Sequence, residues 1–146
     1  NWNRFAERTG GTLVEKCCHY FNLMDLIIGS RPIQVYASGG QDVNHLDEKY
    51  DGKQADMLDN AFVVLDYANG VRAMLDLCMF AEGSYDKEIL TVVGASYIEH
   101  VKFRDAILNK GEAEVTLTDG ATSVITGLAA HRSINEKRIV KLAEMD

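Results

Sequence analysis

Residues 61–80 read AFVVLDYANGVRAMLDLCMF, and this stretch carries the clearest local signal in the chain. Two runs rich in β-forming residues, 61–67 and 71–80, flank the tripeptide Ala68-Asn69-Gly70. Asn-Gly between such runs is a strong short-range signal for a hairpin, because both residues tolerate the backbone angles that a tight turn needs. We therefore predict two antiparallel strands joined at Asn69-Gly70.

The segments around this hairpin predict further strands and three helices. Outward from it we expect strands over 33–38, 88–93, 114–117 and 138–142, and helices over 12–28, 96–109 and 119–132. Residues 41–58 show no clear period and are predicted to form a long loop. Strands joined by hairpins and grouped in mid-chain favour an α+β domain, in which a largely antiparallel open β-sheet carries helices on one face. A doubly wound nucleotide-binding fold is not expected.

Composition limits the class of protein. The 146 residues are 47% hydrophobic and 25% charged, without repeats or linkers, so a single domain over 1–146 is predicted. A net charge of −7 argues against nucleic-acid binding, which needs a basic surface. No apolar run approaches the ~20 residues of a membrane helix. Three cysteines, two of them adjacent, fit a reducing compartment, and we predict a cytoplasmic protein.

The predicted helix over 12–28 has two contrasting faces. Glu15, His19 and Asn22 fall on one side, and a carboxylate at i can reach an imidazole at i+4. Such a carboxylate would orient the ring and raise its pKa, which suits general acid–base catalysis. The alternative is that Glu15 only forms a capping box with Thr12 and that His19 is an ordinary surface residue. The apolar side comprises Leu13, Cys17, Tyr20, Phe21, Met24, Ile27 and Ile28.

Other kinds of site are disfavoured. Cys17-Cys18-His19 lacks the second pair of ligands that a tetrahedral zinc site needs, so no metal is predicted. Gly10-Gly11 and Gly39-Gly40 do not form the Gly-x-Gly-x-x-Gly of a dinucleotide-binding turn, so this chain is not expected to bind a dinucleotide by itself. The acidic residues of 42–59 lack the spacing of an EF-hand and are predicted to lie in a solvated loop.

The segment from Gly10-Gly11 through Glu15 and His19 to Asn22 resembles the start of the C-terminal domain in the glucose–fructose oxidoreductase, inositol dehydrogenase and rhizopine-catabolism (Gfo/Idh/MocA) family. The family signature there is a glycine pair followed by Asp-x-Gly-x-His-x-x-Asp. The resemblance covers nearly the whole chain, because it continues through 59–70, 75–80, 97–103, 119–120 and 129–134.

The resemblance implies an NAD(P)-dependent oxidoreductase that acts on a hydroxyl group of a sugar, cyclitol or related polyol. In the family an N-terminal Rossmann domain binds NAD or NADP, and that domain is not present in these 146 residues. The chain is therefore expected to be a piece of a longer polypeptide and inactive alone. The family's C-terminal domain supplies substrate contacts and the oligomer interface, which implies a homo-oligomer formed through the open sheet.

Carried over by position, the family's histidine falls on His19, which would exchange a proton with the substrate. Glu15 stands where the family has its first Asp, Cys17 where it has Gly, and Asn22 where it has the second Asp. The resemblance thus implies catalytic roles for His19 and Glu15 and substrate contacts for Asn22 and Lys16. The family's catalytic Lys belongs to a Glu-Lys-Pro motif in the other domain, so Lys16 does not correspond to it.

Two departures concern the extent of the chain. The family's domain normally has a strand before Trp2 and a longer stretch between Gly94 and Tyr97, so we expect a deletion or absent residues at these points. The alternative function left open by the sequence is a stand-alone, non-catalytic module that binds a ligand or mediates assembly on the same fold.

Overall fold

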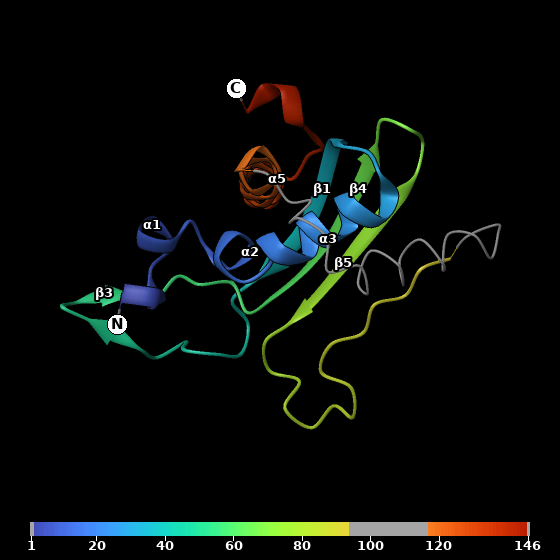
Figure 1. Ribbon diagram of the computed structural model, residues 1–146. Helices are drawn as coiled ribbons and strands as arrows, with labels where there is room; N and C mark the ends of the chain where they lie inside the picture. The colour runs from blue at the N-terminus through green and yellow to red at the C-terminus, as the bar shows by residue number, and fades with distance from the viewer. Residues whose placement is uncertain (1, 94–116, 146) are drawn as a thin grey trace.

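The computed structural model describes residues 2–93 and 117–145. Two layers are evident in Figure 1, a β-sheet and the helices that cover one side of it. The helices are η1 (Trp2–Arg4), α1 (Ala6–Thr9), α2 (Thr12–Glu15), α3 (Cys18–Ile28), α5 (Leu117–Glu136) and η2 (Leu142–Glu144). The strands are β1 (Pro32–Gly40), β2 (Lys49–Tyr50), β3 (Lys53–Gln54), β4 (Asn60–Tyr67), β5 (Arg72–Cys78) and β6 (Val140–Lys141).

The main sheet has the strand order β5-β4-β1-β6, and every neighbouring pair is antiparallel. The predicted hairpin is confirmed, because β4 and β5 pair from Asn60 opposite Cys78 to Asp66 opposite Arg72. The turn closes with the Tyr67 N–H donating to the Val71 carbonyl at 2.9 Å, and Gly70 takes a positive φ of 84°. The predicted α+β class with an open antiparallel sheet is thereby confirmed.

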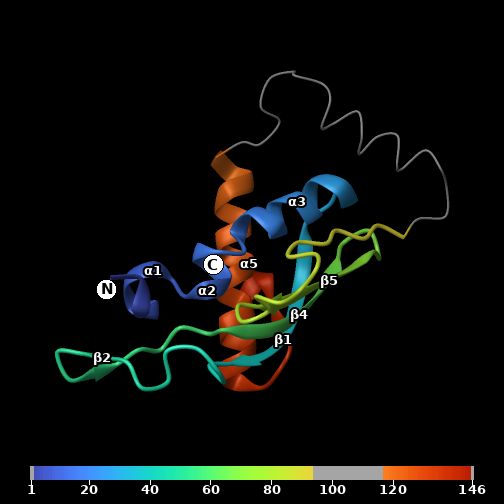
Figure 2. The same cartoon turned by 90° about the horizontal axis from the view of Figure 1, so that it is seen from below.

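The core lies between the sheet and the helices α3 and α5. Alternate residues of β1 and β4 point into it, as the period of a β-strand requires. Figure 2 shows α3 and α5 crossing on the same side of the sheet. The buried members of this core are Leu13, Cys17, Phe21, Val35, Ala37, Ala61, Val63, Leu65, Tyr67, Ala129, Ala130 and Val140.

The opposite face of the sheet is apolar and exposed within the described chain. Tyr36, Val64 and Met74 lie side by side on β1, β4 and β5, because Tyr36 pairs with Val64 and Val64 with Met74. Phe62 lies beside this row and is 56% exposed, and Met74 is 63% exposed. A soluble domain seldom leaves such a contiguous apolar surface open unless something binds there.

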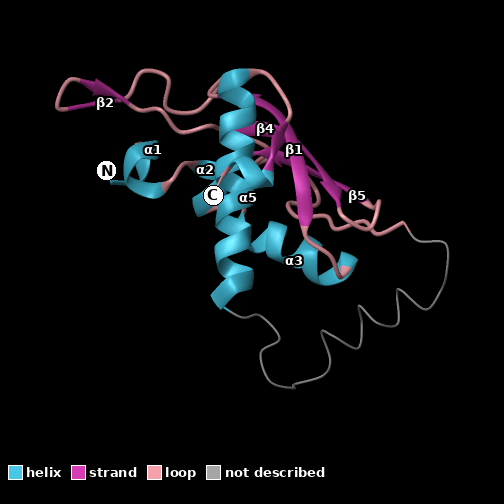
Figure 3. Ribbon diagram, turned by 90° about the horizontal axis from the view of Figure 1, so that it is seen from above, coloured by secondary structure: helices cyan, strands magenta, loops and turns pink. Residues whose placement is uncertain are grey.

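Helix α5 buries a face of small residues. The larger apolar side chains of this helix do not define that face, because Val124 and Leu128 are exposed. The buried positions are Ser123, Thr126, Gly127, Ala129, Ala130 and Ser133. The reason is close approach, since a Cβ on Gly127 would lie 2.9 Å from the Leu13 carbonyl oxygen. Figure 3 shows α5 passing next to α2 and crossing α3.

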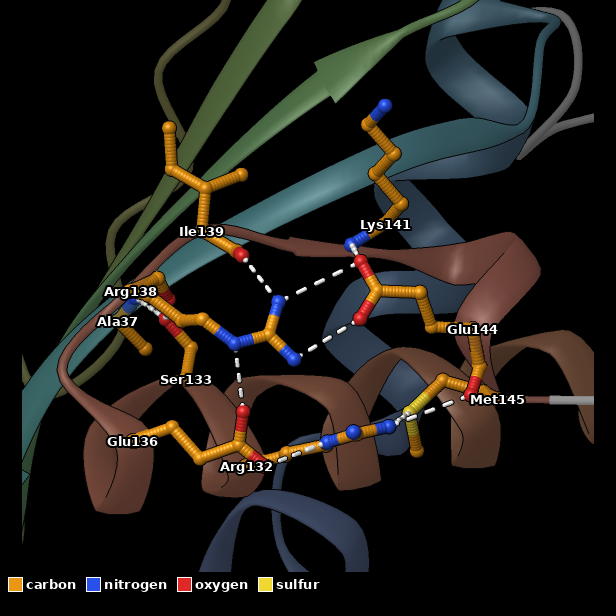
Figure 4. A network of polar contacts seen from close by, with 9 residues as sticks. All are labelled: Ala37, Arg132, Ser133, Glu136, Arg138, Ile139, Lys141, Glu144 and Met145. Carbon is orange, nitrogen blue, oxygen red and sulfur yellow. Dashed lines mark hydrogen bonds and ion pairs between the residues drawn. The ribbon is translucent and has the colours of Figure 1, made fainter.

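The C-terminal residues fold back along β1 and are held by side chains of α5 (Figure 4). The Ser133 hydroxyl accepts from the Ala37 N–H at 2.9 Å and donates to the Arg138 carbonyl at 2.5 Å. The Arg138 guanidinium contacts Glu136 at 2.6 Å and Glu144 at 2.8 Å. The predicted strand over 138–142 is therefore shorter than expected, because η2 begins at Leu142.

The predicted first helix is two helices. A turn at Lys16 and Cys17 separates α2 from α3, although the Lys16 N–H still donates to the Thr12 carbonyl at 2.8 Å. The predicted capping box is wrong, because Gly11 occupies the N-cap and the Thr12 hydroxyl instead donates to the Leu58 carbonyl at 2.6 Å. Gly29 ends α3 as predicted, in a left-handed conformation with φ 64°.

The 41–58 segment contains a small hairpin, β2 with β3, where only a loop was predicted. The acidic residues of 42–59 were predicted to lie in a solvated loop, but Asp59 is buried. Its carboxylate accepts the backbone N–H groups of Asp42, Val43 and Asn44 at 2.6–3.0 Å. Burial alone would raise the pKa of Asp59, but these donors outweigh it and the pKa lies below its usual value.

The remaining predicted elements are the strand over 88–93, the helix over 96–109 and the strand over 114–117. Residues 88–93 form no strand, so the strand predicted there is wrong. Ile89, Leu90 and Val93 are exposed. The helix predicted over 96–109 and residues 114–116 of the strand predicted over 114–117 lie outside the described residues. The described end of that strand, Leu117, is the first residue of α5 instead. Within 2–93 and 117–145, no helix combines the length and hydropathy that crossing a bilayer requires.

Candidate functional site

The segment that carries the predicted site begins at Gly10-Gly11, where the backbone takes φ values of 81° and 87°. These left-handed conformations favour glycine. At Gly11 a side chain is excluded for a second reason, because a Cβ there would overlap the imidazole of His131 on α5. The glycine pair thus turns the chain into α2 while α5 lies directly against it.

Glu15 is the last residue of α2, and its side chain is 18% exposed. One carboxylate oxygen, Oε1, lies 3.0 Å from the ammonium of Lys16. The other, Oε2, is buried and has no hydrogen-bond partner among the described residues. Lys16 follows in the turn between α2 and α3 and is exposed. Glu15 therefore keeps one acceptor that the described residues do not satisfy.

His19 lies in the first turn of α3 and is exposed. The i, i+4 geometry predicted for Glu15 and His19 required one continuous helix, and the helix is interrupted between them. No hydrogen bond joins the two side chains in the part of the chain that the structure describes; Glu15 contacts Lys16 instead. The role of Glu15 in orienting His19 remains a prediction.

Tyr20 accompanies His19, and sequence reasoning assigned it only to the apolar stripe. Its ring lies against the His19 ring, with centroids 4.0 Å apart and planes tilted by 42°. The carboxylate of Glu88 beside its hydroxyl, together with burial, raises the pKa of Tyr20 to about 12. The phenol is therefore protonated at neutral pH, and its single O–H is engaged with Glu88, so Tyr20 meets His19 through its ring.

Asn22 is half-buried, one helical turn beyond His19 on the same side of α3. It lies at the rim of a hollow of about 300 Å³ between the end of α3 and the start of α5. The hollow combines amide, hydroxyl, carboxylate and guanidinium groups with one exposed leucine. Its lining residues are Asn22, Asp25, Leu26, Gly29, Ser30, Arg31 and Asp119.

Two interactions organise this hollow. Arg31 reaches across to α5, where it pairs with Asp119 and donates to the Thr122 hydroxyl. Asp25 accepts a hydrogen bond from the Tyr67 hydroxyl at 2.8 Å through Oδ1, while its Oδ2 is buried without a partner among the described residues. Burial raises the pKa of Asp25, and the bond from Tyr67 opposes that rise only in part.

The described residues do not fit a dinucleotide. Gly10-Gly11 precedes a helix but follows no strand, and Gly39-Gly40 ends β1 but opens no helix. The sheet that they adjoin is antiparallel.

Cys17 is fully buried in the core, and burial raises the pKa of its thiol to about 12, so the thiol stays protonated. Within 2–93 and 117–145, no three His, Cys, Asp or Glu side chains come together as metal ligands.

The fold has counterparts among known proteins. Residues 1–96 match the family model described as the oxidoreductase family (Gfo/Idh/MocA), C-terminal alpha/beta domain. The chain belongs to this family. The resemblance drawn from the sequence is thereby confirmed, and Gfo/Idh/MocA membership makes it part of a family of oxidoreductases.

Individual relatives agree with this assignment. The myo-inositol 2-dehydrogenase of Thermotoga maritima is 29% identical, with an alignment that covers 94% of this chain and 51% of the relative. The aligned stretch spans 174 residues, more than the chain contains, so the relative carries inserted residues. The Gfo/Idh/MocA chain thus spans about half the length of this curated relative.

Solved structures support the same fold. The crystal structure of a dehydrogenase from Thermotoga maritima has a TM-score of 0.66 at 21% identity and covers 99% of this chain and 52% of that chain. GenD2 from gentamicin A biosynthesis, solved in complex with NAD, has a TM-score of 0.65 at 17% identity. It covers 96% of this chain and 50% of that chain. At these identities the likeness establishes the Gfo/Idh/MocA C-terminal fold.

Proposed function

We propose that this chain is the substrate-binding and oligomerisation domain of an NAD(P)-dependent oxidoreductase that acts on a hydroxyl group of a sugar, cyclitol or related polyol. The observation that carries the proposal is His19, an exposed imidazole on α3 at the position of the family's proton-transferring histidine. Family membership and the inositol-dehydrogenase relative support the substrate class.

In this proposal His19 takes the proton of the substrate hydroxyl during oxidation and returns it during reduction. An imidazole suits the task, because its ordinary pKa lies near physiological pH. The Tyr20 ring supports one side of His19, and the Asn22 amide offers both a donor and an acceptor one turn away. Glu15 and Lys16, paired at 3.0 Å, complete the polar surface at the end of α2.

The redox half of the reaction requires NAD or NADP, which would supply or accept the hydride. The described residues do not hold it, so we propose that residues outside these 146 do. The NAD bound in the structure of GenD2 supports this division, because this chain matches 50% of that protein. Glu15, Lys16, His19 and Asn22 then have the task of binding the polyol and moving its proton.

The exposed side of the sheet is the surface we propose for homo-oligomerisation. Tyr36, Phe62, Val64 and Met74 form one apolar area across three neighbouring strands. A second copy that laid the same face against it would cover both, as in a symmetric dimer. Burying apolar area gains about 25 cal/mol per Å², so covering this surface favours association.

The proposal is tested in the polypeptide that carries this chain, by comparing His19→Asn with His45→Asn. NAD(P)H formation is followed with a panel of cyclitols and aldoses. We expect His19→Asn to lower kcat by about 10²–10⁴, the usual contribution of positioned proton transfer. His45 is the matched control, because it takes a positive φ that Asn tolerates. Unchanged turnover in His19→Asn would remove His19 from catalysis.

The alternative is a non-catalytic module that binds a ligand or mediates assembly. It is favoured by one observation, the pairing of Glu15 with Lys16 rather than with His19. A module of this kind would bind polyols without any NAD(P)-linked turnover, and His19→Asn would then change affinity alone.

A further inference from the structure

Helix α2 is four residues long and begins without a capping side chain. Its N-cap is Gly11, which has no side-chain acceptor to offer. The first N–H groups of any helix have no carbonyl partner within the helix, so they must find acceptors elsewhere. A helix this short also gains little from its own hydrogen bonds, so contacts from outside must hold it in place.

The acceptor for one of these groups comes from a distant part of the chain. His131, on α5, accepts the Leu13 N–H at its Nε2 over 3.3 Å. The same ring lies where a Cβ on Gly11 would stand, so the glycine and the histidine fit one another. His131 thus acts as a cap for α2 that is contributed across 118 positions of sequence.

Only an unprotonated Nε2 can accept this hydrogen bond, so the ring must be neutral with its proton on Nδ1. The surroundings favour that form. Burial lowers the pKa of His131 below its ordinary value. The imidazole is therefore neutral at physiological pH, and the Leu13 N–H has its acceptor under the conditions in which an oxidoreductase works.

We propose that His131 is a positioning residue, which fixes the start of α2 and so sets where Glu15 and His19 stand. This inference rests on the proposed function. Two further contacts act on the same turn: the Thr12 hydroxyl donates to the Leu58 carbonyl at 2.6 Å, and α5 approaches the Leu13 carbonyl at Gly127. These contacts orient α2 from the segment before β4 and from α5, and among the described residues the Leu13 N–H donates to His131.

The consequence for catalysis follows from the order of the chain. Glu15 lies two residues after Leu13, and His19 follows across the turn at Lys16 and Cys17. If the Leu13 N–H loses its acceptor, α2 shifts or frays, and both side chains move with it. A misplacement of about 1 Å at a catalytic group can cost on the order of 10²-fold in rate.

The test compares two amides at position 131 in the polypeptide that carries this chain. A glutamine places its side-chain oxygen near the position of Nε2, whereas an asparagine reaches only the position of Nδ1. We expect His131→Gln to keep kcat within about 3-fold of the wild type and His131→Asn to lower it by about 10-fold or more. Because the proposed role is in geometry, KM for the polyol should change less than kcat in both variants.

Hydrogen exchange of the α2 amides provides a readout that does not depend on activity. Protection at residues 13–16 should fall in His131→Asn and be restored in His131→Gln. Unchanged protection and kcat in His131→Asn would overturn the proposal, as would equal loss in both variants, because packing of the ring would then be what matters. If the wild type turned over no polyol, the proposed function would fail, while the exchange result would still show whether His131 caps α2.

Discussion

The crossing of α5 over α2 can be perturbed with a single methyl group at Gly127. An alanine there would bring its Cβ to 2.9 Å from the Leu13 carbonyl oxygen and 3.1 Å from Val14 Cγ2. The carbonyl belongs to the backbone, so it cannot rotate away as a side chain would. We therefore expect α5 or α2 to shift, and both helices carry contacts of the proposed site.

Two opposing terms set the magnitude. Alanine is favoured over glycine in a helix interior by roughly 0.8–1.0 kcal/mol. Inserting a methyl group into a filled contact costs about 1–3 kcal/mol. The expected net result for Gly127→Ala is a loss of up to about 2 kcal/mol in the free energy of unfolding, since the overlap term is the larger of the two.

A matched control isolates the overlap term. Gly120 lies in the same helix, and a Cβ there would meet nothing within 4 Å. Gly120→Ala should therefore gain the helix propensity without the clash, so the difference between the two variants is the cost of overlap. Thermal unfolding measures it, at roughly 2–4 °C per kcal/mol for a protein of this size. If Gly127→Ala were as stable as Gly120→Ala, the close approach of α5 to α2 would be wrong.

Two further predictions concern the loop after β1 and the open sheet face. Asp59→Asn should lower the free energy of unfolding by about 1.5–3 kcal/mol, because a charged acceptor of three N–H groups is lost. Since folding lowers the pKa of Asp59, its contribution is complete above about pH 4, the unfolded value, and is lost as the pH falls through the folded value. Wild type and variant should therefore converge in acid denaturation curves; a constant difference would contradict the assignment. Phe62→Lys should shift the polypeptide toward monomer in sedimentation velocity, whereas Val71→Lys, in the exposed turn, should not; an unchanged assembly would show that copies meet elsewhere.

The hairpin and the sheet follow from local sequence, because their signals lie within a few residues. Asn69-Gly70 fixed the turn, alternation along β4 fixed its buried face, and Gly29 fixed the end of α3. The face of α5 did not follow from hydrophobicity. Where two helices nearly touch, small residues such as Gly127 are selected for distance rather than for apolar area, and a hydrophobic pattern cannot express that.

The predicted site shows the same division between local and distant information. That His19 and Asn22 share one side of a helix is a matter of spacing, and both lie in α3. The predicted pairing of Glu15 with His19 assumed a continuous helix, whereas α2 ends at Glu15 and α3 begins only at Cys18. The contact of His131 with Leu13 had no signal in the sequence, because 118 positions separate the partners.

The segment from α2 to α3 also contains unpartnered buried carboxylate oxygens. A buried acceptor without a donor costs about 1–3 kcal/mol, so a folded chain keeps few of them. In the part of the chain that the structure describes, the buried side-chain oxygens without partners are Glu15 Oε2 and Asp25 Oδ2. These two carboxylates lie on either side of His19 along α2 and α3, and Asp25 lines the hollow that Asn22 also lines. Unmet polar groups are retained where a ligand or a reaction uses them more often than where only stability is at stake. Within the described residues, the unpartnered buried acceptors therefore lie between residues 15 and 25, where a donor from a ligand would relieve that energetic cost.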